Sequence, residues 1–246
     1  MPDDANAAEF QNAGPRDFRT THWSMVLSAG DSQSPDSARA LERLCRMYWY
    51  PLYVFVRRKG HDHEEAQDLT QGFFEKLLAK GYLAAADQQR GKFRTFLLSS
   101  LTNFLANEWD RASRLKRGGH LTFLSLDAEA EAEDRYKLEP VDHATADRLF
   151  EQRWAQTLME CVLERLADEM EPSRFEALKG FLLGEDEASY AAAAAQLGLT
   201  VPAVTSAIHR MRARFGLLLR EEISHTVTND DEVEEEIRHL IKVLTE

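Results

Sequence analysis

The sequence predicts an all-α protein built from two small helical domains. Three observations support this prediction. Apolar residues recur at the helical spacing of 3.6 along most of the chain, and no stretch alternates as a half-buried β-strand would. An acidic segment with paired glycines and a proline interrupts this pattern between residues 119 and 147. A helix-turn-helix pattern follows that interruption, which favours a second, separate helical domain.

The first domain is predicted to span residues 20–118, after a polar segment, 1–19, that we expect to be disordered. The segment LERLCRMYWYPLYVFVRRKG, 41–60, has the apolar spacing of a helix that faces a core. Pro51 either kinks this helix or begins a second one. Two more amphipathic helices follow. Their predicted apolar stripes are Leu69, Phe73, Phe74, Leu77 and Leu78 in the first, and Phe93, Phe96, Leu97, Leu101, Phe104, Leu105 and Trp109 in the second.

The second domain is predicted over residues 148–225, and it contains YAAAAAQLGLTVPAVTSAIHRMRARF. Gly198 suits the turn between two helices, with Ala194 small enough to let them cross. Thr200 is a candidate N-cap of the second helix, and Pro202 lies in its first turn, where proline is tolerated. The side chains expected on the exposed side are Thr205, Ser206, His209, Arg210 and Arg212. Such hydroxyl and guanidinium groups suit base edges and phosphates, although a helical hairpin with a basic surface is the alternative.

Charge is strongly segregated within this acidic chain of formal net charge -12. Basic residues concentrate between Arg90 and His120 and between Val201 and Arg220. Acids dominate the predicted linker, 119–147, and the predicted C-terminal extension, 226–246, which also has the pattern of a weak amphipathic helix. Exposed charges are screened over about 8 Å at physiological salt. Local charge therefore decides binding, and an acidic protein can still present basic surfaces to nucleic acid.

The polar side of the helix beginning at Phe93 is the other candidate nucleic-acid surface. Asparagine and arginine side chains there suit bases and phosphates, and an ordinary polar surface is the alternative. The basic loop 87–94 before it could hold an unstacked base. The residues expected on this polar side are Arg94, Thr95, Ser99, Thr102, Asn103 and Asn107, followed by Arg111 and Arg114.

Other function classes are disfavoured by what the sequence holds. Cys45 and Cys161 are too few for a disulfide framework or a zinc site. His61 and His63 have no further ligands at metal-binding spacing, and we find no phosphate-cradling glycine loop and no nucleophile elbow. We therefore expect neither an enzyme nor a cofactor.

No apolar run approaches the ~18 residues of a membrane helix, and the acidic start lacks the order of a signal peptide. A cytoplasmic protein with no membrane partner is expected.

Three segments, in order, resemble the sigma-70 family of bacterial RNA polymerase sigma factors, in its short, extracytoplasmic-function (ECF)-like form. The part of 41–80 that includes EEAQDLTQGFF resembles regions 2.1–2.2. RGKFRTFLLSSLTNFLANEWDRASRLKR resembles regions 2.3–2.4, and RFEALKGFLLGEDEASYAAAAAQLGLTVPAVTSAIHRMRARF resembles region 4. The resemblance covers about half to two-thirds of the chain. The poly-alanine run and the acidic C-terminal extension depart from the family pattern.

The resemblance implies a factor that directs core polymerase to promoters and promotes melting of the −10 element. It implies polymerase contacts at the β′ clamp and the β flap, the clamp contact falling on Asp68, Gln71 and Phe74. It implies −35 contacts by Thr205, Ser206, His209, Arg210 and Arg212. It implies −10 contacts by Arg90, Lys92, Arg94, Asn103, Asn107, Arg111 and Arg114.

Two alternatives remain open at this point. A helix-turn-helix regulator that binds duplex DNA without polymerase would use only the second domain. For control of activity, an anti-sigma factor is one candidate. Self-inhibition is the other: the acidic C-terminal extension, 226–246, would fold back on a basic DNA-binding surface and compete with DNA.

Overall fold

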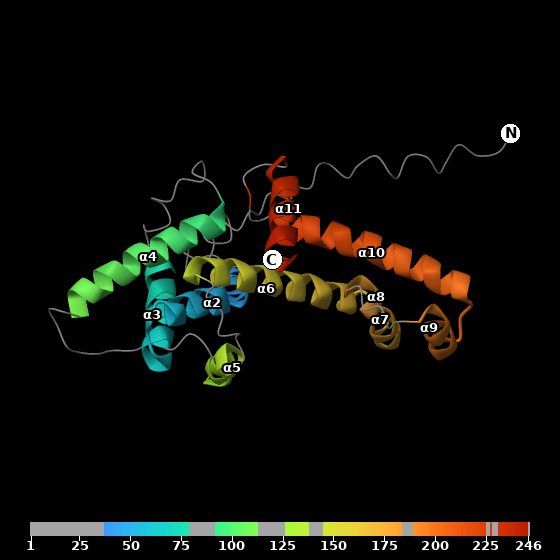
Figure 1. Ribbon diagram of the computed structural model, residues 1–246, viewed down its shortest axis with the longest axis horizontal. Coiled ribbons are helices and arrows are strands. Elements are labelled where there is room, and N and C mark those ends of the chain that lie inside the picture. The colour runs from blue at the N-terminus through green and yellow to red at the C-terminus, as the bar shows by residue number, and fades with distance from the viewer. Residues whose placement is uncertain are drawn as a thin grey trace.

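The computed structural model describes residues 37–78, 92–112, 126–137, 145–183, 189–224, 227 and 231–245. In these ranges every regular element is a helix, which confirms the all-α class (Figure 1). The predicted disordered segment 1–19 lies outside them. The helices are α2 (Ser37–Arg58), α3 (His63–Leu78), α4 (Phe93–Ala112), α5 (Leu126–Lys137), α6 (Ala146–Asp168), α7 (Pro172–Leu178), α8 (Gly180–Leu183), α9 (Tyr190–Leu197), α10 (Val201–Ser224) and α11 (Asp231–Thr245).

Two apolar clusters hold these helices together, and α6 belongs to both. The main core gathers buried side chains from α2, α3, α4, α5, the first part of α6 and α11, with Ile223 at the end of α10. The second core gathers Val162 and Leu166 of α6 with residues of α7, α8, α9 and α10. In Figure 1, α2–α5 lie around one end of α6 and α7–α9 around the other. The boundaries predicted for two domains, 20–118 and 148–225, stay a prediction.

α2 is the central helix of the main core. From Leu44 to Val56 only Arg46 is exposed, so this helix is apolar on nearly every side. Pro51 lies inside α2 without ending it. An interior proline removes one helical hydrogen bond, and burial of its neighbours Leu52 and Tyr53 helps to offset that loss.

The acidic segment between the two predicted domains contains a helix, α5, that is docked on α2. Ala132 of α5 is buried in the main core. Tyr53 donates a hydrogen bond to Glu133 at 2.5 Å, and the Arg57 guanidinium lies 4.6 Å from the ring centre of Tyr136. These contacts fix the middle of the predicted linker against the first helix.

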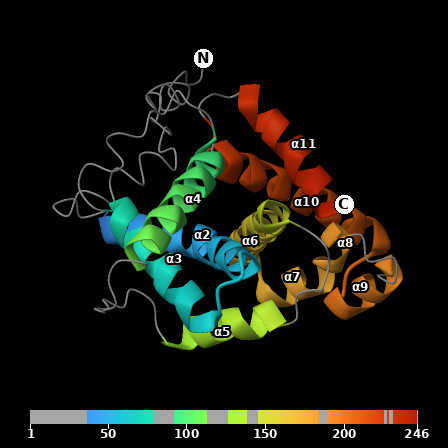
Figure 2. The same ribbon diagram turned by 60° about the vertical axis from the view of Figure 1, so that its left-hand side comes forward.

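The amphipathic helix predicted in 226–246 is confirmed as α11, and it is packed rather than extended into solvent. Val233 and Leu240 are buried in the main core. α11 contacts α6 and the C-terminal part of α10, as both ribbon views show (Figure 2). Among the described residues no single helix is long and apolar enough to cross a membrane; α9 and α10 meet that measure only when they are counted together.

Candidate nucleic-acid interfaces

The predicted helix-turn-helix is confirmed in α9 and α10. Ser189 caps α9 by accepting a hydrogen bond from the backbone of Ala192. Gly198 ends it with a φ of 64°, in the left-handed region, and Leu199 donates to the carbonyl of Ala194 at 2.9 Å. The chain then turns by 99° into α10, within the range of helix-turn-helix motifs. The turn therefore fixes how α10 projects from the second core.

The structure brings together the side chains predicted to contact the −35 element. Thr205, Ser206, His209, Arg210 and Arg212, which we call the exposed α10 face, are all exposed. The opposite side of the helix is buried: Val204, Ala207, Ile208 and Met211. Arg212 donates to the carbonyl of Phe181 at 2.7 Å, which holds its guanidinium at one margin of the face. The arrangement presents hydroxyl, imidazole and guanidinium groups on one rigid helix, with no acid between residues 201 and 220.

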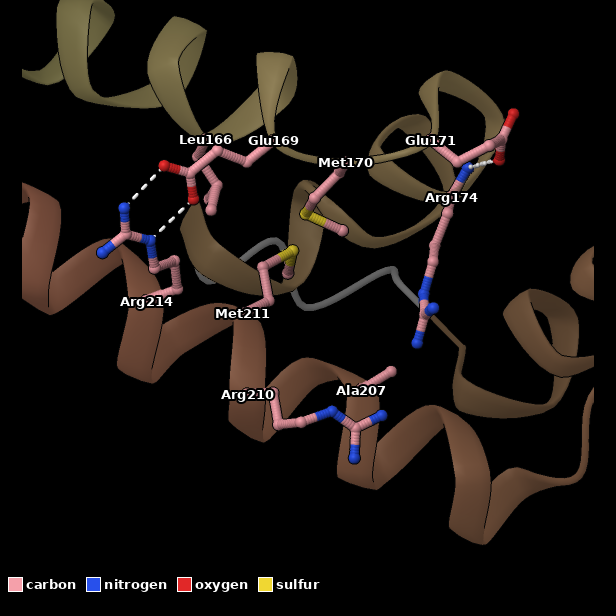
Figure 3. A pocket seen from close by; sticks show the side chains of 9 residues that line it. All are labelled: Leu166, Glu169, Met170, Glu171, Arg174, Ala207, Arg210, Met211 and Arg214. Carbon is pink, nitrogen blue, oxygen red and sulfur yellow. Dashed lines mark hydrogen bonds and ion pairs between the residues drawn. The ribbon is translucent and has the colours of Figure 1, made fainter. Parts of the chain in front are cut away.

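A hollow of about 320 Å³ lies at the other margin of this face (Figure 3). Its apolar lining comes from Leu166, Met170, Ala207 and Met211, where the end of α6 faces α10. Arg214 binds both carboxylate oxygens of Glu169, each at 2.6 Å, and these hydrogen bonds lower the pKa of Glu169. Arg174 and Arg210 also line the hollow.

The polar side of α4 agrees only in part with the predicted surface. Asn103 and Asn107 are exposed. Thr95, Ser99 and Thr102 are exposed as well. Asn103 and Asn107 are therefore the exposed members of the predicted −10 set among the residues whose side chains are described.

Arg94 was predicted on that exposed side, and this placement is wrong. Its position three residues before Leu97 and seven before Leu101 turns it toward the core. Its guanidinium donates to both oxygens of Glu151, at 3.1 and 2.8 Å, and pairs with Glu236 of α11. It also lies over the Trp154 ring, 4.7 Å from the centroid. Two carboxylates and an aromatic face compensate its burial.

The remaining residues of the predicted −10 set have different outcomes. Lys92 is half-buried and pairs with Glu236 at 2.6 Å. Arg90 and Arg114 lie outside the described residues, as does most of the loop 87–94. Arg111 belongs to α4 by its backbone, and its side chain is not described.

Trp109 was predicted in the apolar stripe of α4, and its side chain is instead 74% exposed. It lines a hollow of about 410 Å³ with Leu69, Leu105 and Glu108. Its spacing matches the stripe, so the periodicity alone gave no sign of this exposure.

The three predicted polymerase contacts on α3 do not share one exposed surface. Asp68 is exposed and Gln71 is half-buried. Phe74, predicted as the aromatic member of a protein-binding face, is only 3% exposed and packs against Phe73 in the main core. Only the first two are accessible in this conformation.

Cys45, His61 and His63 are buried or in contact with other side chains. Burial raises the pKa of Cys45 to about 11, which keeps its thiol protonated at neutral pH. His61 pairs with Glu65, and His63 contacts the Tyr53 hydroxyl at 3.0 Å. No group of three or more potential metal ligands gathers within the ranges described above.

In comparisons with known proteins, no protein-family model, no curated protein and no solved structure matches this chain. The helix-turn-helix and the resemblance in sequence are therefore the features from which a function is inferred.

Proposed function

We propose that the protein is a sigma factor that directs bacterial core RNA polymerase to specific promoters. The single observation that carries this proposal is the exposed α10 face, an acid-free set of hydrogen-bonding side chains on the second helix of a helix-turn-helix. Such a helix fits the major groove, where hydroxyl and guanidinium groups can bind base edges and phosphates. The ordered resemblance of three segments to sigma regions favours a polymerase subunit among helix-turn-helix proteins.

The protein would contribute binding energy and no bond chemistry. α10 would bind the −35 element, while Asn103 and Asn107 of α4 would contact the opened −10 strand. Unstacking a base step costs a few kcal/mol, which contacts from both helices and from polymerase would offset. Asp68, which is exposed, and Gln71, which is half-buried, are the candidates for contact with the β′ clamp.

A helix-turn-helix regulator that acts without polymerase is the second candidate, and one observation favours it. The sigma hypothesis assigns Arg94 to DNA and Phe74 to polymerase, but both side chains are buried. The side chains of the exposed α10 face, in contrast, are all exposed. Such a regulator would bind duplex DNA tightly by itself.

Transcription in vitro with bacterial core polymerase and genomic DNA tests the proposal, with the start sites mapped. We expect initiation at a defined set of sites that core enzyme alone does not use. A variant carrying Ser206→Ala and Arg210→Ala should lose that selectivity, and Arg148→Ala, an exposed position on the first turn of α6, is the matched control. A lack of stimulation on every template, with no co-purification of the polymerase, would favour the second candidate.

We also propose that α11 restrains DNA binding by the first domain. Glu236 is almost fully buried and pairs with Lys92 and Arg94, two of the predicted −10 contacts. The restraint would act there, because the exposed α10 face is open to solvent with α11 in position. DNA phosphates and Glu236 would then compete for the same cations.

Glu236→Gln should therefore bind a random-sequence single-stranded oligonucleotide more tightly than the wild type in a fluorescence anisotropy titration. Arg94 keeps its hydrogen bonds to Glu151, so the fold should persist, as circular dichroism would verify. Glu235→Gln removes the same charge from an exposed position on α11 and is the control. An equal gain in both variants would reduce the effect to net charge and contradict the proposed restraint. Deletion of residues 226–246 gives a second variant that should bind at least as tightly.

A further inference from the structure

Two arginines at the margin of the exposed α10 face have charges that the described residues do not neutralise. Arg174 comes from α7 and Arg210 from α10, and both line the hollow beside that face (Figure 3). Neither guanidinium has a carboxylate partner in the described part of the chain. Arg214, on the same wall of the hollow, differs because Glu169 binds it through both oxygens.

The two acids nearest to Arg174 in sequence are Glu176 and Glu171, and both are occupied elsewhere. Glu176 pairs with Lys179 at 2.6 Å. The Glu171 carboxylate accepts hydrogen bonds from the backbone of Ser173 at 3.0 Å and of Arg174 at 2.9 Å. In Figure 3 the Arg174 side chain extends from this cap toward α10, while the Glu171 carboxylate lies on the opposite side. The guanidinium of Arg174 is thus directed to the side of the hollow where Arg210 lies.

Glu171 also lines the hollow, but its carboxylate is held by the backbone of Ser173 and Arg174. The two guanidinium charges therefore repel each other unless another anion lies between them. The aliphatic stems of both arginines can rest on the apolar lining made by Met170, Ala207 and Met211, which leaves the charged heads at the mouth. Guanidinium groups bind phosphate oxygens through paired N–H donors, and they do so better than an ammonium would. The chemistry of the pair therefore fits a phosphate.

The position of the pair indicates which phosphate. Arg210 is four residues after Ser206 and adjacent to His209, so it borders the side of α10 that would enter a groove. A major groove is about 12 Å wide and has a phosphodiester backbone on either side. Arg212, held by the Phe181 carbonyl, lies at the opposite margin of the face. A helix in the groove would then have guanidinium groups at both backbones.

We propose that Arg174 and Arg210 together clamp one backbone phosphate of the duplex bound by α10. This inference rests on the proposed function and adds a contact from α7, outside the helix-turn-helix. Arg174 would position the duplex and carry no base specificity, because phosphate contacts are independent of sequence.

The salt dependence of DNA binding tests this clamp. The full-length protein would be titrated into a fluorescent random-sequence duplex at several salt concentrations. Each phosphate contact adds a slope of about 0.9 to the plot of log affinity against log salt. Between 50 and 200 mM salt, the affinity of the double variant Arg174→Ala, Arg210→Ala should therefore fall about 3.5-fold less than that of the wild type. Arg174→Ala and Arg210→Ala should each lose part of this difference, because the remaining arginine still faces the shared phosphate.

Arg148→Ala is the matched control, since it removes an exposed arginine from the first turn of α6, about 30 Å along that helix from the hollow. A wild-type slope in Arg174→Ala would overturn the clamp, and so would an equal change in Arg148→Ala. If Arg174→Ala keeps the wild-type slope but binds core polymerase more weakly, the hollow would be assigned to a protein contact instead. A wild-type protein that binds no duplex would also overturn it. If the variants show the expected change in salt dependence but the wild-type protein directs no transcription from promoters, only the proposed sigma function would be overturned.

Discussion

At the scale of single residues, Glu222 ties α10 to two other helices through a carboxylate that is almost fully buried. Arg43 of α2 donates to both of its oxygens, at 2.8 and 2.6 Å, and Arg165 of α6 donates to one. Burial by itself would raise the pKa of Glu222, but the two arginines outweigh it, and the pKa is lowered. The second half of α10 is therefore anchored by charge as well as by apolar contacts.

Acid should weaken this anchor. A carboxyl group with a lowered pKa in the folded state stabilises the fold above its unfolded pKa, and that stability is lost as pH falls through the folded value. Glu222→Gln should lower the free energy of unfolding by about 1.5–3 kcal/mol at pH 7, the range for a hydrogen bond to a charged group. The drop in the free energy of unfolding that Glu222→Gln causes should become smaller as the pH is lowered toward 3. Urea denaturation of both proteins across this range measures the effect, with Glu64→Gln, at an exposed position in the first turn of α3, as control. A loss independent of pH would contradict the charge-based account.

At the scale of helices, periodicity and turn residues carry most of the information that the sequence holds. They predicted α9, the turn at Gly198 and α10, because these features depend on neighbours along the chain. They failed for Arg94, whose partner Glu151 is 57 residues away. They failed for Trp109 because only tertiary packing decides whether a stripe is covered to its end. The exposed α10 face was predictable, whereas the contribution of Arg174 depends on how α7 packs beside α10.

Two glycines allow the turn to be tested against a helix interior. Gly198 has a φ of 64°, and an added Cβ would meet no atom within 4 Å, so Gly198→Ala should cost only backbone strain. We expect a loss of about 1–2 kcal/mol. Gly216 lies inside α10, where a Cβ would meet only the end of the Arg220 side chain at 3.6 Å. Gly216→Ala should stabilise by about 0.5–1 kcal/mol. Thermal unfolding of both variants measures these opposite signs, and a loss in both would show that α10 tolerates no added methyl group.

At the scale of the whole molecule, the two cores are linked by continuous helices. α6 runs from Phe150 and Trp154 in the main core to Val162 and Leu166 in the second. α10 begins in the second core, and its Ile223 lies in the main core. Because α6 and α10 each contribute buried side chains to both cores, unfolding either helix would disrupt both cores. We therefore expect the two cores to unfold in one cooperative transition, unlike two domains on a flexible linker.

Damage to the second core should therefore be detected in the main core. Leu178 of α7 is fully buried in the second core, so Leu178→Ala should cost about 2–5 kcal/mol. Trp49 and Trp154, both buried in the main core, report on the other end of the molecule by fluorescence. In urea, fluorescence and circular dichroism should give one shared midpoint that the substitution lowers for both signals. Leu217→Ala, on an exposed side chain of α10, should leave that midpoint nearly unchanged.

A fluorescence midpoint that stays at the wild-type value, while circular dichroism becomes biphasic, would mean that the cores unfold independently. The helix-turn-helix would then be a separate domain, as the sequence predicts, and α6 would have to break between Leu158 and Val162.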